Sequence, residues 1–203
     1  MATGEQTYVR RTGTGSLPGG RRLTWTCADG SRGRRWRSIT TYPDGRLVNA
    51  LLLETGPDGR LARVEISAPT GLLTLHPDVS DGTLHGNIVR ADGVEHVTLP
   101  WSARHILVLE GSPVTAVVAA SALAPRIAAG EGAGVPAVAV TDLLGVRVAT
   151  WHAAHTGERR WRLLDAAGGP VLTVELDDDG IPSNLDDART WPMEQGTARA
   201  PVR

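Results

Sequence analysis

Six Asp-Gly pairs spaced along the chain constrain its fold more than any other feature of the sequence. Asp-Gly is the dipeptide that tight hairpin turns prefer, because both of its residues tolerate a positive φ. Extended segments rich in Val, Leu, Ile and Thr lie between the pairs, and residues 60–67 alternate apolar with polar side chains. The pairs lie at residues 29–30, 44–45, 58–59, 81–82, 92–93 and 179–180. This pattern predicts an all-β chain.

The segment 113–124 breaks this strand pattern. Ser112 and Pro113 suit the first positions of a helix, an Ala-rich stretch follows, and Pro125 suits its end. A buried strand is the alternative, because several of the residues are β-branched. Strands are expected at 21–27, 34–41, 46–54, 60–67, 71–76, 83–89, 94–99, 104–110, 135–141, 146–151, 159–165 and 170–176. We therefore predict one long antiparallel sheet curled into a β-roll or open barrel, with a single short helix.

The chain is expected to form one domain over residues 21–194. Residues 1–20, which are rich in glycine, are predicted to be a flexible lead or a loosely held strand, and residues 195–203 a loose tail. Two similar halves are indicated, because Trp25 and Trp36 recur about 125 residues later as Trp151 and Trp161, again with arginines beside the second Trp. We expect the halves to close one sheet; chance similarity in an Arg-rich chain is the alternative.

Composition excludes several classes of protein. The net charge is −1, so the chain has no global field that would attract nucleic acid or an anionic membrane. The lone Cys27 rules out an intrachain disulfide and a four-thiolate zinc site. Residues 1–22 lack the apolar stretch of a secretory signal, and the apolar run near 114–124 is too short to span a bilayer. We expect a cytoplasmic monomer or homodimer that binds no nucleic acid and does not insert into membranes.

Three of the six histidines are expected to share one face of a three-stranded meander over residues 83–109. A turn at 91–93 would place His85 opposite Thr98 and Asn87 opposite His96, and a loop at 100–103 would place Thr98 opposite His105. If this face lined a cavity, the three histidines would act as acid–base groups, and Asn87 and Thr98 would be ligand-binding residues. The alternative is a solvated polar face. No metal site is expected, because the histidines lack ligand spacing and no carboxylate accompanies them on that face.

A short sequence repeat includes one of these histidines. Thr-Leu-His occurs at residues 74–76 and again at 83–85, nine positions apart. The two copies are typical of two strand ends.

Tryptophan and arginine form the second group of candidate site residues. Trp36, Trp101 and Trp161 are candidates for an apolar wall with a polar N–H, although core packing is the alternative for each of them. Arg35 and Arg37 are candidates for gripping an anionic head group. The alternative for the arginines is a solvated charged face that lies opposite the acidic residues of segment 175–187.

Several segments resemble a known pattern in their strand order and turn placement. They are RWRS at 35–38, DGRLV at 44–48, LARVEI at 61–66, the 92–93 turn, EGSPVT at 110–115, RWRL at 160–163 and VLTVELDDDGI at 171–181. Together they cover about residues 21–191 and resemble the bacterial family described as glycolipid-binding proteins. The resemblance implies a spiral β-roll related to lipoprotein carriers. It carries over no catalytic residue.

These observations lead to two expected functions. The first is binding of a hydrophobic or amphiphilic small molecule, lipid-like or polyketide-like, on the concave side of the curled sheet, with no cofactor. The second is a cofactor-independent cyclase or isomerase of secondary metabolism that uses His85, His96 and His105 in the same cavity. An interaction domain that binds another protein through a sheet edge or a charged pole is a third possibility.

Overall fold

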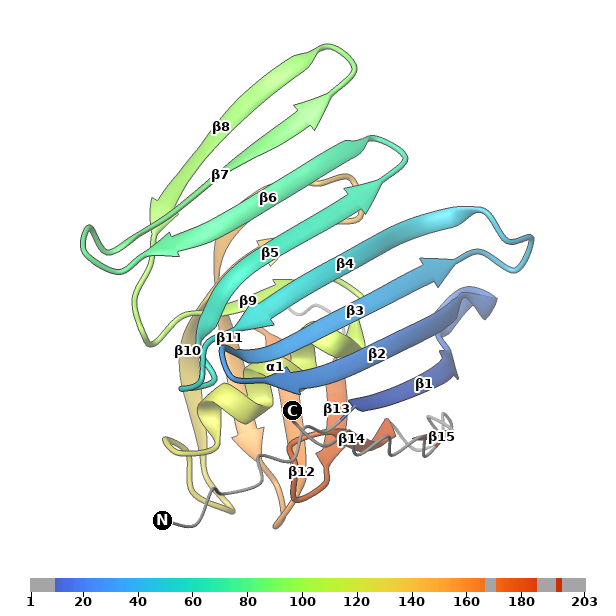
Figure 1. Ribbon diagram of the computed structural model, residues 1–203. Helices are drawn as coiled ribbons and strands as arrows, with labels where there is room; N and C mark the ends of the chain where they lie inside the picture. The colour runs from blue at the N-terminus through green and yellow to red at the C-terminus, as the bar shows by residue number, and fades with distance from the viewer. Residues whose placement is uncertain (1–9, 167–170, 186–192, 195–203) are drawn as a thin grey trace, which may run out of the picture.

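The chain forms two β-sheets that enclose one short helix (Figure 1). The computed structural model describes residues 10–166, 171–185 and 193–194. The first sheet has nine strands in the order β15-β1-β2-β3-β4-β5-β6-β7-β8, and every neighbouring pair in it is antiparallel. The second has six strands in the order β14-β13-β12-β11-β10-β9. The predicted all-β class, with a long curled antiparallel sheet and one short helix, is confirmed.

Strands β2 to β13 match the twelve expected segments closely, because each lies between local turn signals, whereas β1, β14 and β15 are not among those segments. In the first sheet they are β1 (Arg10–Ser16), β2 (Arg22–Gly30), β3 (Gly33–Thr41), β4 (Leu47–Thr55), β5 (Leu61–Ala68), β6 (Gly71–Asp78), β7 (Thr83–Arg90), β8 (Gly93–Pro100) and β15 (Met193–Glu194). In the second sheet they are β9 (Ile106–Leu109), β10 (Gly132–Val140), β11 (Val146–His155), β12 (Arg160–Asp165), β13 (Val171–Leu176) and β14 (Pro182–Leu185). A short 3₁₀ turn, η1, covers Pro18–Gly20.

The Asp-Gly pairs mark the turns as expected, with one shift in position. Gly45, Gly59, Gly82, Gly93 and Gly180 all have a positive φ at hairpin connections. The first pair, at 29–30, instead ends β2, and the glycine with positive φ in that hairpin is residue 33.

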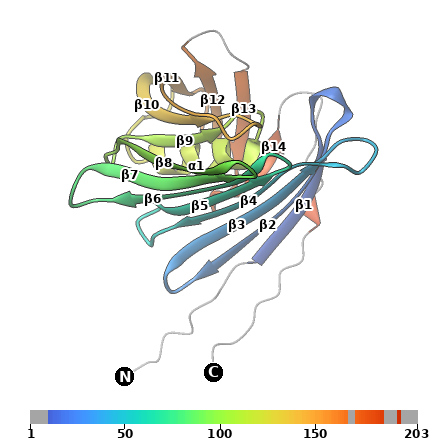
Figure 2. The same cartoon turned by 90° about the horizontal axis from the view of Figure 1, so that it is seen from above.

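The helix α1 (Pro113–Leu123) connects the two parallel strands β9 and β10. Pro113 occupies the first helical turn, where its missing N–H costs no hydrogen bond. Eight of its eleven residues are buried, whereas Val118, Ser121 and Ala122 are half-buried and form its more open side. In Figure 2 the first sheet curves around α1 and the second sheet, so its concave face packs against them. One continuous hydrophobic cluster includes side chains from both sheets and from α1.

The expected meander over residues 83–109 is wrong in its third strand. β9 pairs in parallel with β10 in the second sheet, so Thr98 does not lie opposite His105. All four residues of β9 are buried. Such a strand needs cover on both faces, which it finds between α1 and the core and would not find beside the exposed strand β8. The Trp-bearing halves likewise lie in separate sheets and do not close a single one.

Of the two alternatives for the N-terminal lead, flexible or a strand, residues 10–16 form a strand, β1. This strand pairs with β2 along its whole length. Gly13 makes the pairing possible: a Cβ at this position would lie 2.5 Å from Nε1 of Trp25. Residues 1–9 and the expected loose tail, 195–203, lie outside the described residues.

Among the residues that the structure describes, no helix has both the length and the apolar character needed to cross a membrane.

Candidate functional site

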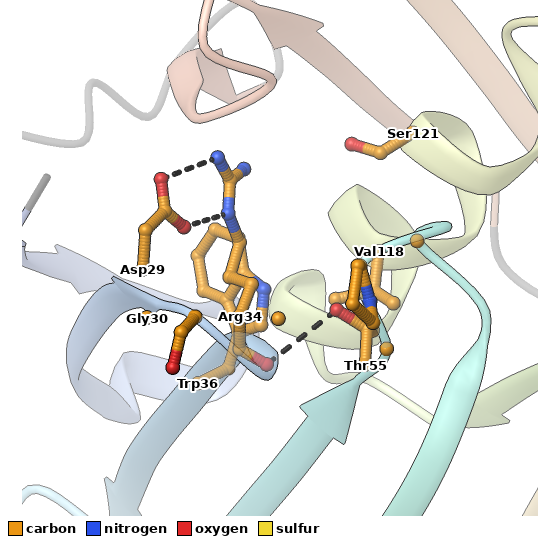
Figure 3. A pocket seen from close by; sticks show the side chains of 12 residues that line it. Asp29, Gly30, Arg34, Trp36, Thr55, Val118 and Ser121 are labelled. Carbon is orange, nitrogen blue, oxygen red and sulfur yellow. Dashed lines mark hydrogen bonds and ion pairs between the residues drawn. The ribbon is translucent and has the colours of Figure 1, made fainter. Parts of the chain in front are cut away.

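Two hairpin turns of the first sheet and one side of α1 surround an open cleft of about 410 Å³, which we call the inner cleft (Figure 3). The β2–β3 turn contributes one wall, the β4–β5 turn another, and α1 the third. Its lining residues are Asp29, Gly30, Ser31, Gly33, Arg34, Trp36, Thr55, Gly56, Pro57, Gly59, Val118 and Ser121. Its volume lies within the range of about 300–1,000 Å³ that small-molecule sites occupy.

Gly33 brings the two hairpins together at the cleft. Its φ of +117° is a conformation that residues with side chains rarely adopt. A Cβ at this position would lie only 2.0 Å from the carbonyl oxygen of Thr55 at the end of β4. The first residue of β3 therefore lies against the β4 backbone, which fixes one edge of the cleft.

The floor of the inner cleft is aromatic and apolar. Trp36 is 1% exposed and packs against Trp25, with ring centroids 5.7 Å apart at an interplanar angle of 39°. Val118 of α1 is half-buried and points toward this floor (Figure 3). An apolar group of a ligand would therefore rest on Trp36 and Val118.

Arg34 places a cation above this floor. Its guanidinium carbon lies 6.0 Å from the centroid of the Trp36 ring. Nε and Nη2 donate to the carboxylate of Asp29 at 2.5 and 3.1 Å, and Nη1 donates to the carbonyl oxygen of Asp179 at 2.7 Å. These bonds use three of the five N–H groups of a guanidinium. Burial lowers the pKa of Arg34, but the hydrogen bond to Asp29 and the nearby negative charges of Asp29 and Asp179 together outweigh it, so the pKa lies above its ordinary value.

A second open cleft of about 800 Å³, the outer cleft, meets the first at the β2–β3 turn. The two share six lining residues, including Asp29, Gly33, Arg34 and Thr55. Four arginines and two carboxylates line the outer cleft, namely Arg32, Arg34, Arg35, Arg63, Asp29 and Glu54. Its lining is therefore cationic, although the chain as a whole is nearly neutral.

The acidic residues 177–179 form ion pairs with arginines, and these pairs account for part of the charged surface. Arg11 pairs with Asp177 at 3.0 Å and also with Asp179. Arg159 pairs with Asp178 at 2.5 Å. These ion pairs fasten the β13–β14 turn to both sheets, so some of the arginines have a structural role.

The predicted ligand-binding residues separate into two groups. Trp36 lines the inner cleft and Arg35 the outer cleft, where Arg35 also pairs with Glu54. Arg37 is exposed on β3 outside both clefts, and Trp161 is buried in the second sheet. The imidazole of His155 covers Trp161, with ring centroids 4.3 Å apart and nearly parallel planes.

Trp101 and His105 lie together in the segment between the sheets. Their rings stack with centroids 5.4 Å apart, and Nδ1 of His105 accepts the N–H of Ser102 at 3.0 Å. Burial lowers the pKa of His105. The cavity that these two rings help to line measures only about 30 Å³, which is near the volume of one water molecule.

The other predicted histidines lie on the outer face of the first sheet, opposite the core. The predicted pairs are correct: His85 lies opposite Thr98, and Asn87 opposite His96. His96 is exposed and bonds through Nδ1 to Oδ1 of Asn87 at 2.6 Å. With His105 in the segment before β9, the expected trio is not brought together.

Sequence reasoning missed several residues that the fold gathers. Asp29, Arg34, Thr55, Val118 and Ser121 come from separate segments of the chain, so no motif joins them. Arg34 alone had a signal, since it belongs to the Arg-rich segment 32–37. The expectation that no carboxylate accompanies the histidines is wrong for His85, because β6 and its turn bring Asp78 and Asp81 beside it. The repeated triplet Thr-Leu-His at residues 74–76 and 83–85 is the sequence signal that could have predicted this proximity.

Comparison with known proteins supports the fold. A DUF1089 family protein from Pseudomonas aeruginosa is similar in structure, with a TM-score of 0.51 and 14% sequence identity over 92% of this chain and 94% of that one. No protein-family model matches the sequence. No curated protein matches it either.

Proposed function

We propose that this chain binds a single-chain amphiphile with an anionic head group at the junction of the inner and outer clefts. The apolar chain would lie in the inner cleft on Trp36 and Val118. The head group would lie at the β2–β3 turn, near Arg32 and Arg34. The observation that carries the proposal is the position of the Arg34 guanidinium 6.0 Å above the Trp36 ring, at the rim that both clefts share.

The charge distribution supports an anionic head group. Arginine binds phosphate and carboxylate groups through paired N–H donors, and the bonds described for Arg34 leave two of its donors for a ligand. Arg32 is exposed in the turn. Arg35 and Arg63 also line the outer cleft, where Arg35 pairs with Glu54 and Arg63 with Glu65. The partial burial of Arg34 strengthens its interaction with an anion relative to one at a fully exposed site.

The position of the site differs from the one expected from the sequence. The ligand was expected on the concave face of the sheet, but α1 and the second sheet pack there. The clefts lie at the end of the curled sheet, between strand turns and helix. The acid–base enzyme receives no support from this geometry, because His85 and His96 lie on the outer face and outside both clefts.

Isothermal titration with dodecyl phosphate, below its micelle concentration, tests the proposal. We expect saturable binding of one molecule per chain, and weaker binding of dodecyl maltoside, which has the same chain and no charge. Arg32→Gln should weaken dodecyl phosphate binding about tenfold, the loss of one charge-assisted contact. Arg104→Gln is the matched control, because this exposed arginine lies outside both clefts.

A second pair of variants tests the apolar part of the site. Val118→Asn should weaken binding of dodecyl phosphate, whereas Ala122→Asn, one helical turn later and outside the inner cleft, should leave it unchanged. Absence of saturable binding would overturn the proposal. So would equal affinities in wild type, Arg32→Gln and Val118→Asn.

A further inference from the structure

The outer face of the β6–β7 hairpin carries a cluster of histidine and aspartate that the proposed function does not use. His76 on β6 and His85 on β7 are register partners, and their ring centroids lie 6.3 Å apart. Asp78 follows His76 by two positions, so both side chains lie on the same face of β6. Asp81 lies in the turn that joins the strands. We call these four residues the hairpin cluster.

The donor atoms of this cluster lie close enough to share one ion. One carboxylate oxygen each of Asp78 and Asp81 and one ring nitrogen of His85 all lie within 4.8 Å of one another. Ligand bonds of about 2.1 Å in a tetrahedral site put donor atoms roughly 3.4 Å apart, so a side-chain movement of about an ångström would close the site. The His76 ring stands beside His85 on the neighbouring strand, outside this group of three donors, and would supply a fourth donor by turning toward them.

Hydrogen bonds already orient two members of the cluster. Oδ1 of Asp78 accepts the backbone N–H of Ser80 at 2.9 Å and its hydroxyl at 2.6 Å. These hydrogen bonds fix the direction of the Asp78 carboxylate. The hydroxyl of Thr83 lies 2.7 Å from Nε2 of His85. Oγ1 of Thr98 lies 3.4 Å from Nδ1, the other ring nitrogen of His85. A metal ion would therefore displace one of these two hydroxyls, while the other fixes the direction of the ring.

We propose that the hairpin cluster binds one divalent first-row transition metal ion, such as Zn²⁺, through His76, Asp78, Asp81 and His85. Two imidazoles with two carboxylates suit Zn²⁺ and its neighbours, whereas Mg²⁺ and Ca²⁺ prefer oxygen donors alone. The site was not expected from the sequence, since the strand that supplies His76 and Asp78 was left out of the predicted histidine face. It is independent of the proposed amphiphile site, which lies at other turns.

Competition between the metal-free full-length chain and a chromophoric zinc chelator tests this site. We expect one Zn²⁺ per chain, and at least tenfold weaker binding in each of His85→Ala, His76→Ala and Asp81→Asn. His96→Ala is the matched control, because His96 lies on the same face but bonds to Asn87 outside the cluster. The thermal midpoints of all four variants without metal report whether each one folds.

The ring nitrogens of the histidines give a second readout. In ¹⁵N spectra of the folded chain, Zn²⁺ should shift the signals of His76 and His85 and leave those of His96 unchanged. The proposal would be overturned by the absence of saturable Zn²⁺ binding. Binding that survives unchanged in His85→Ala and Asp81→Asn would overturn it equally.

Discussion

The β2–β3 and β11–β12 hairpins begin from the same sequence pattern and end in opposite roles. Each buries two tryptophans beside arginines, in the first and second sheet respectively. In β11–β12 a stacked imidazole, His155, covers Trp161. In β2–β3 a guanidinium, Arg34, stands above Trp36 and an open cleft lies next to it. The two tryptophans are buried alike, so the hairpins differ in what covers the ring: an imidazole in one, and a guanidinium beside an open cleft in the other.

Truncating the matched tryptophans should have the largest effect, and it should be similar in both hairpins. Trp36 and Trp161 are each at most 2% exposed, so Trp36→Ala and Trp161→Ala should each lower the free energy of unfolding by about 3–5 kcal/mol through lost burial and a residual cavity. Urea unfolding measures this. A mild effect at Trp36 alone would mean that it serves only as a ligand surface and not as core.

Substituting the turn glycines should cost more stability in the β2–β3 hairpin than in the β11–β12 hairpin. Gly33→Ala should cost more than about 2 kcal/mol, because its φ is +117° and its Cβ would clash with the Thr55 carbonyl oxygen at 2.0 Å. Gly157→Ala, in the β11–β12 turn, should cost less than about 1 kcal/mol, because its Cβ would meet only Arg160 at 3.9 Å. Equal costs by thermal unfolding would contradict the role given to Gly33 at the cleft edge.

Removing the arginines at matched positions, Arg34 and Arg159, should likewise destabilise the β2–β3 hairpin more than the β11–β12 hairpin. Arg34→Ala should lower the free energy of unfolding by about 2 kcal/mol, because it leaves Asp29, whose side chain is 29% exposed, without its paired donors. Arg159→Ala should change stability by less than about 0.5 kcal/mol, since both side chains of its ion pair with Asp178 are largely exposed. Denaturant unfolding of wild type and both variants, at low and at high salt, measures the two losses of stability. An equal loss at both positions would contradict the distinction.

Cys27 provides a smaller test, since Ala153 occupies the matched position in the second hairpin. Burial raises the pKa of the Cys27 thiol from 9.0 to about 12. The unfolded chain therefore loses this proton first as pH rises, and the stability contributed by the neutral thiol declines between pH 9 and 12. Relative to Cys27→Ala, wild type should lose about 1 kcal/mol of stability between pH 8 and 10. Parallel pH profiles of the two proteins would rule this out.

Strand and helix positions could be predicted from the sequence because their signals are local. The Asp-Gly turns and the Ser112-Pro113 start of α1 each act within a few residues. The division into two sheets could not be predicted, because it depends on β9 leaving β8 to pair with β10, about thirty residues further along the chain. The full pairing of β1 with β2 could likewise not be predicted, because it depends on Gly13 leaving room for the Trp25 ring.

Only some residues of the two candidate sites could be predicted from the sequence. The Arg and Trp composition of segment 32–37 identified one wall of the clefts, but Thr55 and Val118 reach it through tertiary packing alone. The register between β7 and β8 was predicted correctly, so His85 and Thr98 pair as expected. The hairpin cluster does not follow from the predicted histidine face, because that face covers residues 83–109 and does not include β6, which carries His76 and Asp78.

Nuclear magnetic resonance of the tryptophan indole N–H groups tests the central claim most directly, because it observes both hairpins in one sample. Dodecyl phosphate should shift the Trp36 signal and leave the Trp161 signal in place, with amide shifts confined to the β2–β3 turn, the β4–β5 turn and the exposed side of α1. Equal shifts of Trp36 and Trp161, or shifts confined to the outer face of β6–β8, would contradict the account.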